Sequence, residues 1–327
     1  MAFSGNINYK ELNDIVASFI TLFDIDKDTF AETEKLSIKI LKEQYLPTET
    51  DEWSRDFSLN ETVDIVYEFL DSFDHNMATQ YNTLLHQRYE DGTLAVNFVD
   101  GKYNPDEESY FDYDQHVQFV FFNNPLDVTT LLHEMIHMMN SCKIEVEENI
   151  GDFLFKLIGN TETRVLLGES ASITFELLLS EYMLKKGYIT ENDYNLIYND
   201  RLDSTKVNAE EIIVLNELIK LYLRDGHIDF INLTNLLNSR DRKSIVGKVL
   251  RYEYRTYDYL LDALDEGELH INESEKYVLG FTIAKEILKE IDPLKETLWL
   301  HDELGDANSN LDTVIDDLNR DLSVKIR

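Results

Sequence analysis

Leu131-Leu132-His133-Glu134-Met135-Ile136-His137-Met138-Met139 contains two histidines four residues apart, with a glutamate directly after the first. The other residues of this stretch are apolar, which predicts a helix buried on almost every side. Side chains four residues apart lie on one face of a helix. The two imidazoles can therefore converge on one metal ion, and Glu134, about 100° around the helix, can reach a water bound to that ion.

This spacing predicts that His133 and His137 bind zinc and that Glu134 acts as a general base. Zinc lowers the pKa of its bound water to about 7, and a neighbouring carboxylate can take the proton as the water attacks a polarised carbonyl. The chemistry that this arrangement favours is amide hydrolysis. The competing interpretation is a core helix whose two histidines find hydrogen-bond partners among other buried groups.

The composition predicts a mainly α-helical protein. The chain has 327 residues, of which 43% are hydrophobic, enough for a large single domain or for two lobes around a cleft. Only 4 prolines and 12 glycines interrupt a composition rich in helix-forming residues. The net charge of −34 disfavours nucleic acid and anionic membranes as partners.

Cys142, the single cysteine, excludes an internal disulfide framework and favours a reducing compartment. It follows the histidine helix closely, but a lone cysteine is more often a small core residue than a metal ligand. The first residues lack the pattern of a secretory signal, and no apolar stretch approaches the length of a membrane span. We therefore expect a cytoplasmic protein.

Hydrophobic periodicity and turn residues predict the order of the elements along the chain. We expect helices at 12–23, 27–45 and 60–89, strands at 94–99 and 117–122, then the histidine helix, a second long helix at 160–186, and an almost wholly helical remainder. Asp127 or the threonines after it are expected to start the histidine helix. We divide the chain into an N-terminal helical lobe, residues 1–90, and a catalytic region, residues 91–327.

The predicted helix at 160–186 is where a third zinc ligand is expected. Glu162, Glu169 and Glu176 follow one another at intervals of seven residues, so they lie nearly on one face of that helix. A catalytic zinc site has three protein ligands and one open position, and two histidines with one glutamate meet that requirement. The spacing alone leaves all three glutamates as candidates, and those that do not bind zinc could orient a zinc-bound histidine or be structural.

Two longer segments and one shorter one are similar to a known enzyme family. Asn124–His137, Gly168–Lys186 and, less closely, Lys276–Ala284 resemble the zinc oligopeptidases of the M3 family, specifically the oligoendopeptidase F branch. That branch has an Asp-Val-x-Thr-Leu segment before His-Glu-Leu-Gly-His, an Ala-Glu-Ile-Ala-Ser-Thr-x-Asn-Glu helix, and a Tyr-Ala-Thr-Gly stretch. The resemblance implies that Glu169 is the third zinc ligand and that Tyr277 donates a hydrogen bond to the developing oxyanion.

The resemblance covers roughly residues 85–290, with three departures from the family pattern. Ile136 stands where the family has glycine before its second zinc histidine. Tyr103-Asn104-Pro105 follows Gly101-Lys102 in place of the family's glycine- and alanine-containing substrate loop. The histidine expected before Tyr277 is not at its usual distance, and His270 is the nearest candidate for a second oxyanion donor.

The resemblance implies a zincin-like fold, with a small β-sheet beside the histidine helix and two helical lobes around a cleft. Because the chain is shorter than full oligoendopeptidases, we expect a reduced N-terminal lobe and a more open cleft. The functional hypothesis is a zinc metallopeptidase with one Zn²⁺ per chain that hydrolyses peptide bonds of oligopeptides. The alternatives are an inactive zinc-binding regulatory protein derived from such a peptidase, and a zinc hydrolase acting on a small non-peptide amide. The oligomeric state is left open.

Overall fold

The computed structural model describes most of the chain and all four residues of the predicted zinc site. The described residues are 8–98 apart from 28 and 30, 109–111, 117–147, 153–229, 231, 260–261, 264, 273–290 and 292–305. These residues are mainly α-helical with one small β-sheet, as the composition predicted. Among the described helices, none combines the length and the apolar composition needed to cross a bilayer.

The chain divides into two compact units, each assembled from two separate segments. Unit 1 combines Met1–Gln44 with Leu202–Leu279, and unit 2 combines Tyr45–Arg201 with Gly280–Arg327. This division differs from the boundary at residue 90 expected from the sequence. All three predicted zinc ligands belong to unit 2.

Unit 1 has its own apolar core, to which the first N-terminal helix contributes. Its described elements are α1 (Tyr9–Leu22), α2 (Ala31–Leu41), the part of α7 (Glu191–Asp225) from Leu202 onward, and the part of α11 (Glu273–Ile287) up to Leu279. Val16 and Phe19 of α1 are fully buried in one cluster with Ile219 of α7. The two helices predicted at 12–23 and 27–45 are therefore confirmed, although α2 is shorter than expected.

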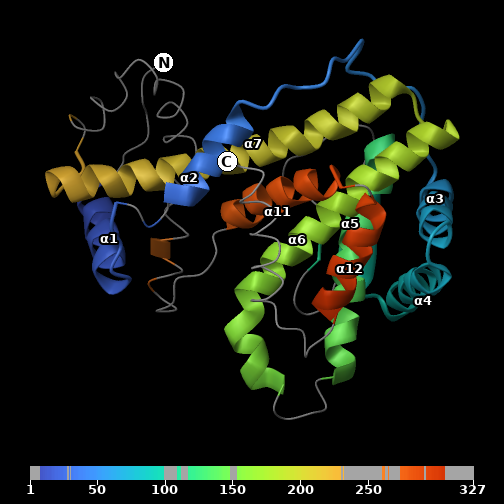
Figure 1. Ribbon diagram of the computed structural model, residues 1–327, viewed down its shortest axis with the longest axis horizontal. Coiled ribbons are helices and arrows are strands. Elements are labelled where there is room, and N and C mark those ends of the chain that lie inside the picture. Colours follow the sequence, from blue (N-terminus) through green and yellow to red (C-terminus); the bar gives the residue numbers. More distant parts are fainter. Residues whose placement is uncertain are drawn as a thin grey trace. The chain divides into compact units, whose positions relative to one another are not determined.

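Unit 2 carries the remaining elements (Figure 1). They are α3 (Leu59–Asp71), α4 (His75–Asp91), β1 (Leu94–Phe98), β2 (Tyr110–Phe111), β3 (Val117–Phe121), α5 (Pro125–Glu147), α6 (Phe153–Lys186), the start of α7, the end of α11, and α12 (Pro293–Gly305). Figure 1 shows α5 and α6 running side by side in opposite directions. Their apolar side chains share one core, which includes Met135, Ile136 and Phe175.

The single helix predicted at 60–89 is wrong, because the structure has two helices, α3 and α4, there. Apolar residues recur at helical spacing up to Phe73, so the periodicity does not reveal the boundary between α3 and α4. Asp74 causes it, since its carboxylate accepts hydrogen bonds from the backbone N–H groups of Asn76 and Met77 and so caps a new helix. Gly92, with φ +79°, ends α4.

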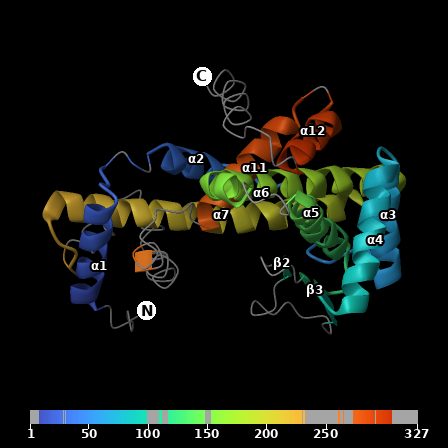
Figure 2. The same cartoon turned by 90° about the horizontal axis from the view of Figure 1, so that it is seen from below.

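The sheet has the strand order β1-β3-β2, with β3 parallel to β1 and antiparallel to β2. The two predicted strands are confirmed as β1 and β3, whereas the two-residue β2 was not predicted. Phe119 and Phe121 on β3 are buried in the same core as α5. Figure 2 shows the strands on one side of α5 and α12 on the other, so the small sheet does lie beside the histidine helix.

The turn from β3 into α5 corrects the predicted start of the histidine helix. The helix begins at Pro125, and the side chain of Asn124 caps it by accepting from the N–H of Leu126 at 2.8 Å. Asp127 lies inside the first turn, and its carboxylate accepts from the backbone N–H groups of Phe122 and Asn124. The carboxylate of Asp127 therefore links the end of β3 to the start of α5 through these hydrogen bonds. Burial raises the pKa of Asp127 to about 6 despite these bonds.

Candidate metal centre

The two histidines of α5 lie one helical turn apart and face the same point. The Nε2 atoms of His133 and His137 are 3.1 Å apart. Such proximity follows from the spacing of four residues, which places the two rings on one face of the helix, where they meet edge to face. Two ring nitrogens this close need a proton or a cation between them, because their lone pairs repel each other.

Glu169 brings the third donor group from the neighbouring helix α6. Its Oε2 lies 3.4 Å from Nε2 of His133, and its Oε1 lies 3.5 Å from Nε2 of His137. Ligand atoms about 2.0–2.1 Å from a tetrahedral zinc ion lie about 3.3 Å from one another. The N–N separation and the nearest N–O separation of each histidine, to different oxygens of Glu169, are close to that value, so the cluster is compatible with a zinc-sized cation.

These three side chains form a buried group that could hold a metal ion. The side chains of His133 and Glu169 are each only 6% exposed. Two imidazole nitrogens and one carboxylate are a donor set that zinc accepts readily. The predicted ligands His133, His137 and Glu169 are therefore brought together, and the donors suit the predicted cofactor.

Glu176, one of the glutamates that the spacing left open, contacts the other nitrogen of the first histidine. Its Oε2 lies 3.2 Å from Nδ1 of His133, and it accepts a hydrogen bond of 2.7 Å from Nη2 of Arg201. A carboxylate at Nδ1 favours the tautomer whose Nε2 lone pair is available to a metal. Arg201, on α7, is a residue that sequence reasoning missed, because no local spacing relates it to the histidines.

The charges of this cluster favour a cation at the three ligands. Burial by itself lowers the pKa of His133, but the carboxylates of Glu176 and Glu169 outweigh burial and raise that pKa to about 10. Burial raises the pKa of Glu176, whereas Arg201 and His133 outweigh it and hold this pKa below the usual range. The field that holds a proton on His133 also attracts a metal ion, which takes the place of the proton on binding.

Glu134 lies beside the ligands in the same buried environment and is only 7% exposed. Burial is the main reason that its pKa rises to about 7, and the charges of Glu169 and Glu176 add to the rise while that of His133 opposes it. A metal cation nearby would lower this pKa by favouring the carboxylate. A carboxylate whose pKa lies near neutrality is suited to exchange a proton with water.

Helix α11 approaches closely to Glu169, the predicted third ligand. A Cβ atom placed on Gly280 would lie 3.1 Å from Cβ of Glu169 and 3.3 Å from the backbone nitrogen of Ser170. Only glycine allows α11 to pack this closely against α6. Tyr277 lies on the same helix, three residues before Gly280 and so on nearly the same face. Its predicted oxyanion role stays a prediction.

The remaining sequence-based predictions fall in different parts of the chain. Ile136 is fully buried in the core of unit 2, so the branched side chain that replaces the family's glycine is accommodated. His270 and the segment 103–105 lie outside the described residues, as do the side chains of Glu162 and Cys142.

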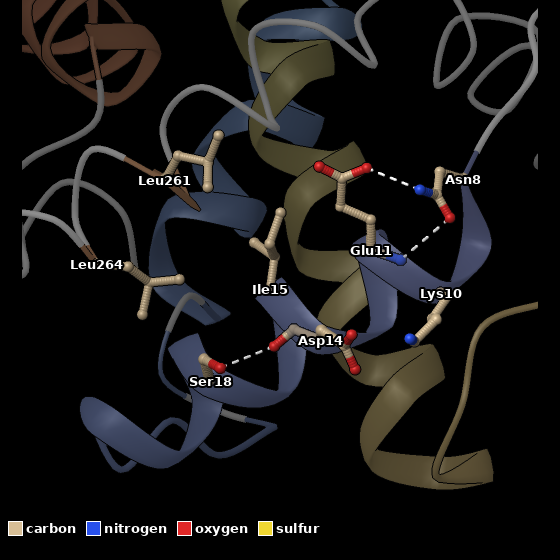
Figure 3. Close-up of a pocket in the computed structure, with 8 residues that line it drawn as sticks. All are labelled: Asn8, Lys10, Glu11, Asp14, Ile15, Ser18, Leu261 and Leu264. Atoms are coloured by element: carbon tan, nitrogen blue, oxygen red, sulfur yellow. Dashed lines mark hydrogen bonds between the residues drawn. The ribbon is translucent and has the colours of Figure 1, made fainter.

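A hollow in unit 1 offers a different kind of surface (Figure 3). It has a volume of about 440 Å³ and lies against α1, with Leu261 and Leu264 on its other side. Asn8 and Glu11 bond each other at the start of α1, so these polar groups already serve the helix cap. The described residues that line it include no histidine or cysteine, and the cluster of possible metal ligands in unit 2 is the stronger candidate site.

No protein-family model matches the chain, and neither a curated protein nor a solved structure does. The resemblance to M3 oligopeptidases therefore stays a prediction from the sequence motifs.

Proposed function

We propose that this protein is a zinc metallopeptidase, with one Zn²⁺ per chain held by His133, His137 and Glu169. The observation that carries the proposal is the convergence of the two histidine nitrogens and the Glu169 carboxylate: the two Nε2 atoms are 3.1 Å apart, and each has a different oxygen of Glu169 within 3.4 or 3.5 Å, which is compatible with one shared ion. Three protein ligands leave one coordination position free for reactants, as in catalytic zinc sites.

Zinc in this position would polarise a carbonyl group and acidify water, which are the requirements of amide hydrolysis. Glu134 would take the proton from the attacking water and return it to the leaving amine. Its place on α5, directly after His133, puts the carboxylate next to the metal without making it a ligand. A purely structural zinc site has four protein ligands and no use for such a base, so Glu134 favours hydrolysis over a regulatory role.

The finer parts of the proposal rest on the resemblance to the oligoendopeptidase F branch. These are a zincin-like fold with two helical lobes around a cleft, an oligopeptide substrate, and a cytoplasmic location. Tyr277, and with it His270, would donate hydrogen bonds to the oxyanion that forms at the scissile carbonyl. Removing a donor of this kind from a hydrolase costs about 3–4 kcal/mol of transition-state stabilisation.

The test is hydrolysis of a library of internally quenched fluorescent peptides by the purified full chain, with and without a chelator. Glu134→Gln keeps the shape of the side chain but removes its basicity, so this variant should bind zinc at one equivalent and lose turnover. Glu181→Gln is the matched control, because Glu181 lies on the exposed surface of α6 and pairs only weakly with Lys185 in solvent. The control should cleave at the parent rate.

Three outcomes would contradict the proposal. Full turnover by Glu134→Gln would remove the general-base role. Zinc bound at one equivalent without cleavage of any peptide would support the regulatory zinc protein. Chelator-sensitive hydrolysis confined to small amides would support the hydrolase that acts on a small non-peptide amide.

A further inference from the structure

Three helices contribute to a chain of contacts behind the first zinc histidine. His133 lies on α5, Glu176 on α6 and Arg201 on α7, and all three belong to unit 2. Nη2 of Arg201 lies 2.7 Å from both carboxylate oxygens of Glu176. Oε2 of that carboxylate lies 3.2 Å from Nδ1 of His133, on the opposite side of the ring from Glu169.

Burial gives this chain of contacts its strength. The side chain of Glu176 is 4% exposed and that of Arg201 is 19% exposed. Charged pairs shielded from water interact more strongly than exposed pairs, and removing one partner leaves a costly buried charge. With Arg201 in place, the carboxylate of Glu176 is held in one orientation and cannot turn away from His133.

We propose that Arg201 is a positioning residue for the metal centre, which acts through Glu176 to orient Nε2 of His133 toward the metal. This inference rests on the proposed zinc site and extends it to a residue on a third helix. Partners that orient metal-binding histidines typically change metal affinity by about 10–100-fold when they are removed.

The contact pattern also indicates which property of Arg201 matters. One nitrogen, Nη2, reaches both oxygens of Glu176 at 2.7 Å, so a single charged nitrogen makes both of these contacts. A single positive charge at this point could therefore serve. Arg201→Lys should retain much of the effect, whereas Arg201→Met, which has a similar apolar stem but no charge, should lose it.

The experiment measures the zinc affinity of the metal-free full chain in competition with a chromophoric chelator. The visible spectrum of the Co²⁺-loaded protein serves as a second readout of ligand geometry. Arg201→Met should raise the Kd for zinc by about 10-fold or more and alter the Co²⁺ spectrum, and Arg201→Lys should restore most of both. Arg224→Met is the matched control, since Arg224 lies on the same helix and pairs with Asp225 at the surface. It should bind zinc like the parent.

A double-variant cycle tests whether Arg201 acts through Glu176. Glu176→Gln alone should weaken zinc binding, and adding Arg201→Met to it should cause little further loss. Equal zinc affinity of parent and folded Arg201→Met, or losses that simply add in the double variant, would overturn the inference while leaving the zinc site intact. If Arg201→Met does not fold, Glu176→Gln decides the matter, because an unchanged zinc Kd in that variant would leave Arg201 no residue through which to act. A parent chain that binds no zinc would overturn both this inference and the proposed function.

Discussion

Gly280→Ala should disturb the metal centre through packing alone, because the added methyl carbon would lie 3.1 Å from Cβ of Glu169 and 3.3 Å from the backbone nitrogen of Ser170. Ordinary contacts begin near 3.4 Å, so α6 must shift by a few tenths of an ångström. Overpacking of this kind costs about 1–3 kcal/mol. Glu169 lies at the point of contact, so the shift should also weaken zinc binding.

Gly168→Ala is the matched control for this prediction. A Cβ atom on Gly168 would lie 3.8 Å from Nδ1 of His137, which is an ordinary contact. Both glycines lie inside helices, so both substitutions gain about 1 kcal/mol of helix propensity, and this gain cancels in the comparison. Urea unfolding should show Gly168→Ala to be more stable than Gly280→Ala by about 1–3 kcal/mol. Gly168→Ala should also have the lower Kd for zinc. Equal stability and zinc affinity of the two variants would refute the argument from close packing.

Two further predictions concern acid stability and metal binding. The carboxylate of Glu68 accepts hydrogen bonds from Tyr188, Lys186 and Tyr182, which lower its pKa from 4.5 to about 2. The stability that these bonds contribute is therefore present above pH 4.5 and is lost as the pH falls toward 2. Melting curves of the parent and Glu68→Gln should differ above pH 5 and converge below pH 3, and a constant difference would contradict this. Free zinc at 100 times its Kd should stabilise the parent by about 2.7 kcal/mol in calorimetry but not His133→Ala, and an equal gain in both would place the ion elsewhere.

The pairing of the two histidines could be predicted from the sequence because their alignment is a local property of one helix. A separation of four residues places His133 and His137 on one face whatever the rest of the chain does. The helical class was equally predictable, since few prolines and glycines interrupt the chain. The choice of Glu169 was not local, because it depends on which turn of α6 packs against α5.

Other features could not be predicted, because the residues that form them lie far apart in the sequence or because a stronger sequence pattern conceals them. Arg201 is 25 residues from Glu176 in sequence, and nothing in the spacing of either residue relates the two. The break between α3 and α4 was hidden by apolar residues that continue at helical spacing, although Asp74 is a good helix cap. The two-residue strand β2 is too short to show a period of two.

Anomalous diffraction at the zinc absorption edge, from crystals of the zinc-loaded full chain, tests the central claim most directly. The account predicts one strong peak about 2.0–2.2 Å from Nε2 of His133, Nε2 of His137 and a carboxylate oxygen of Glu169, with no fourth protein ligand. A peak elsewhere, or a fourth side chain bound at this one, would contradict the account.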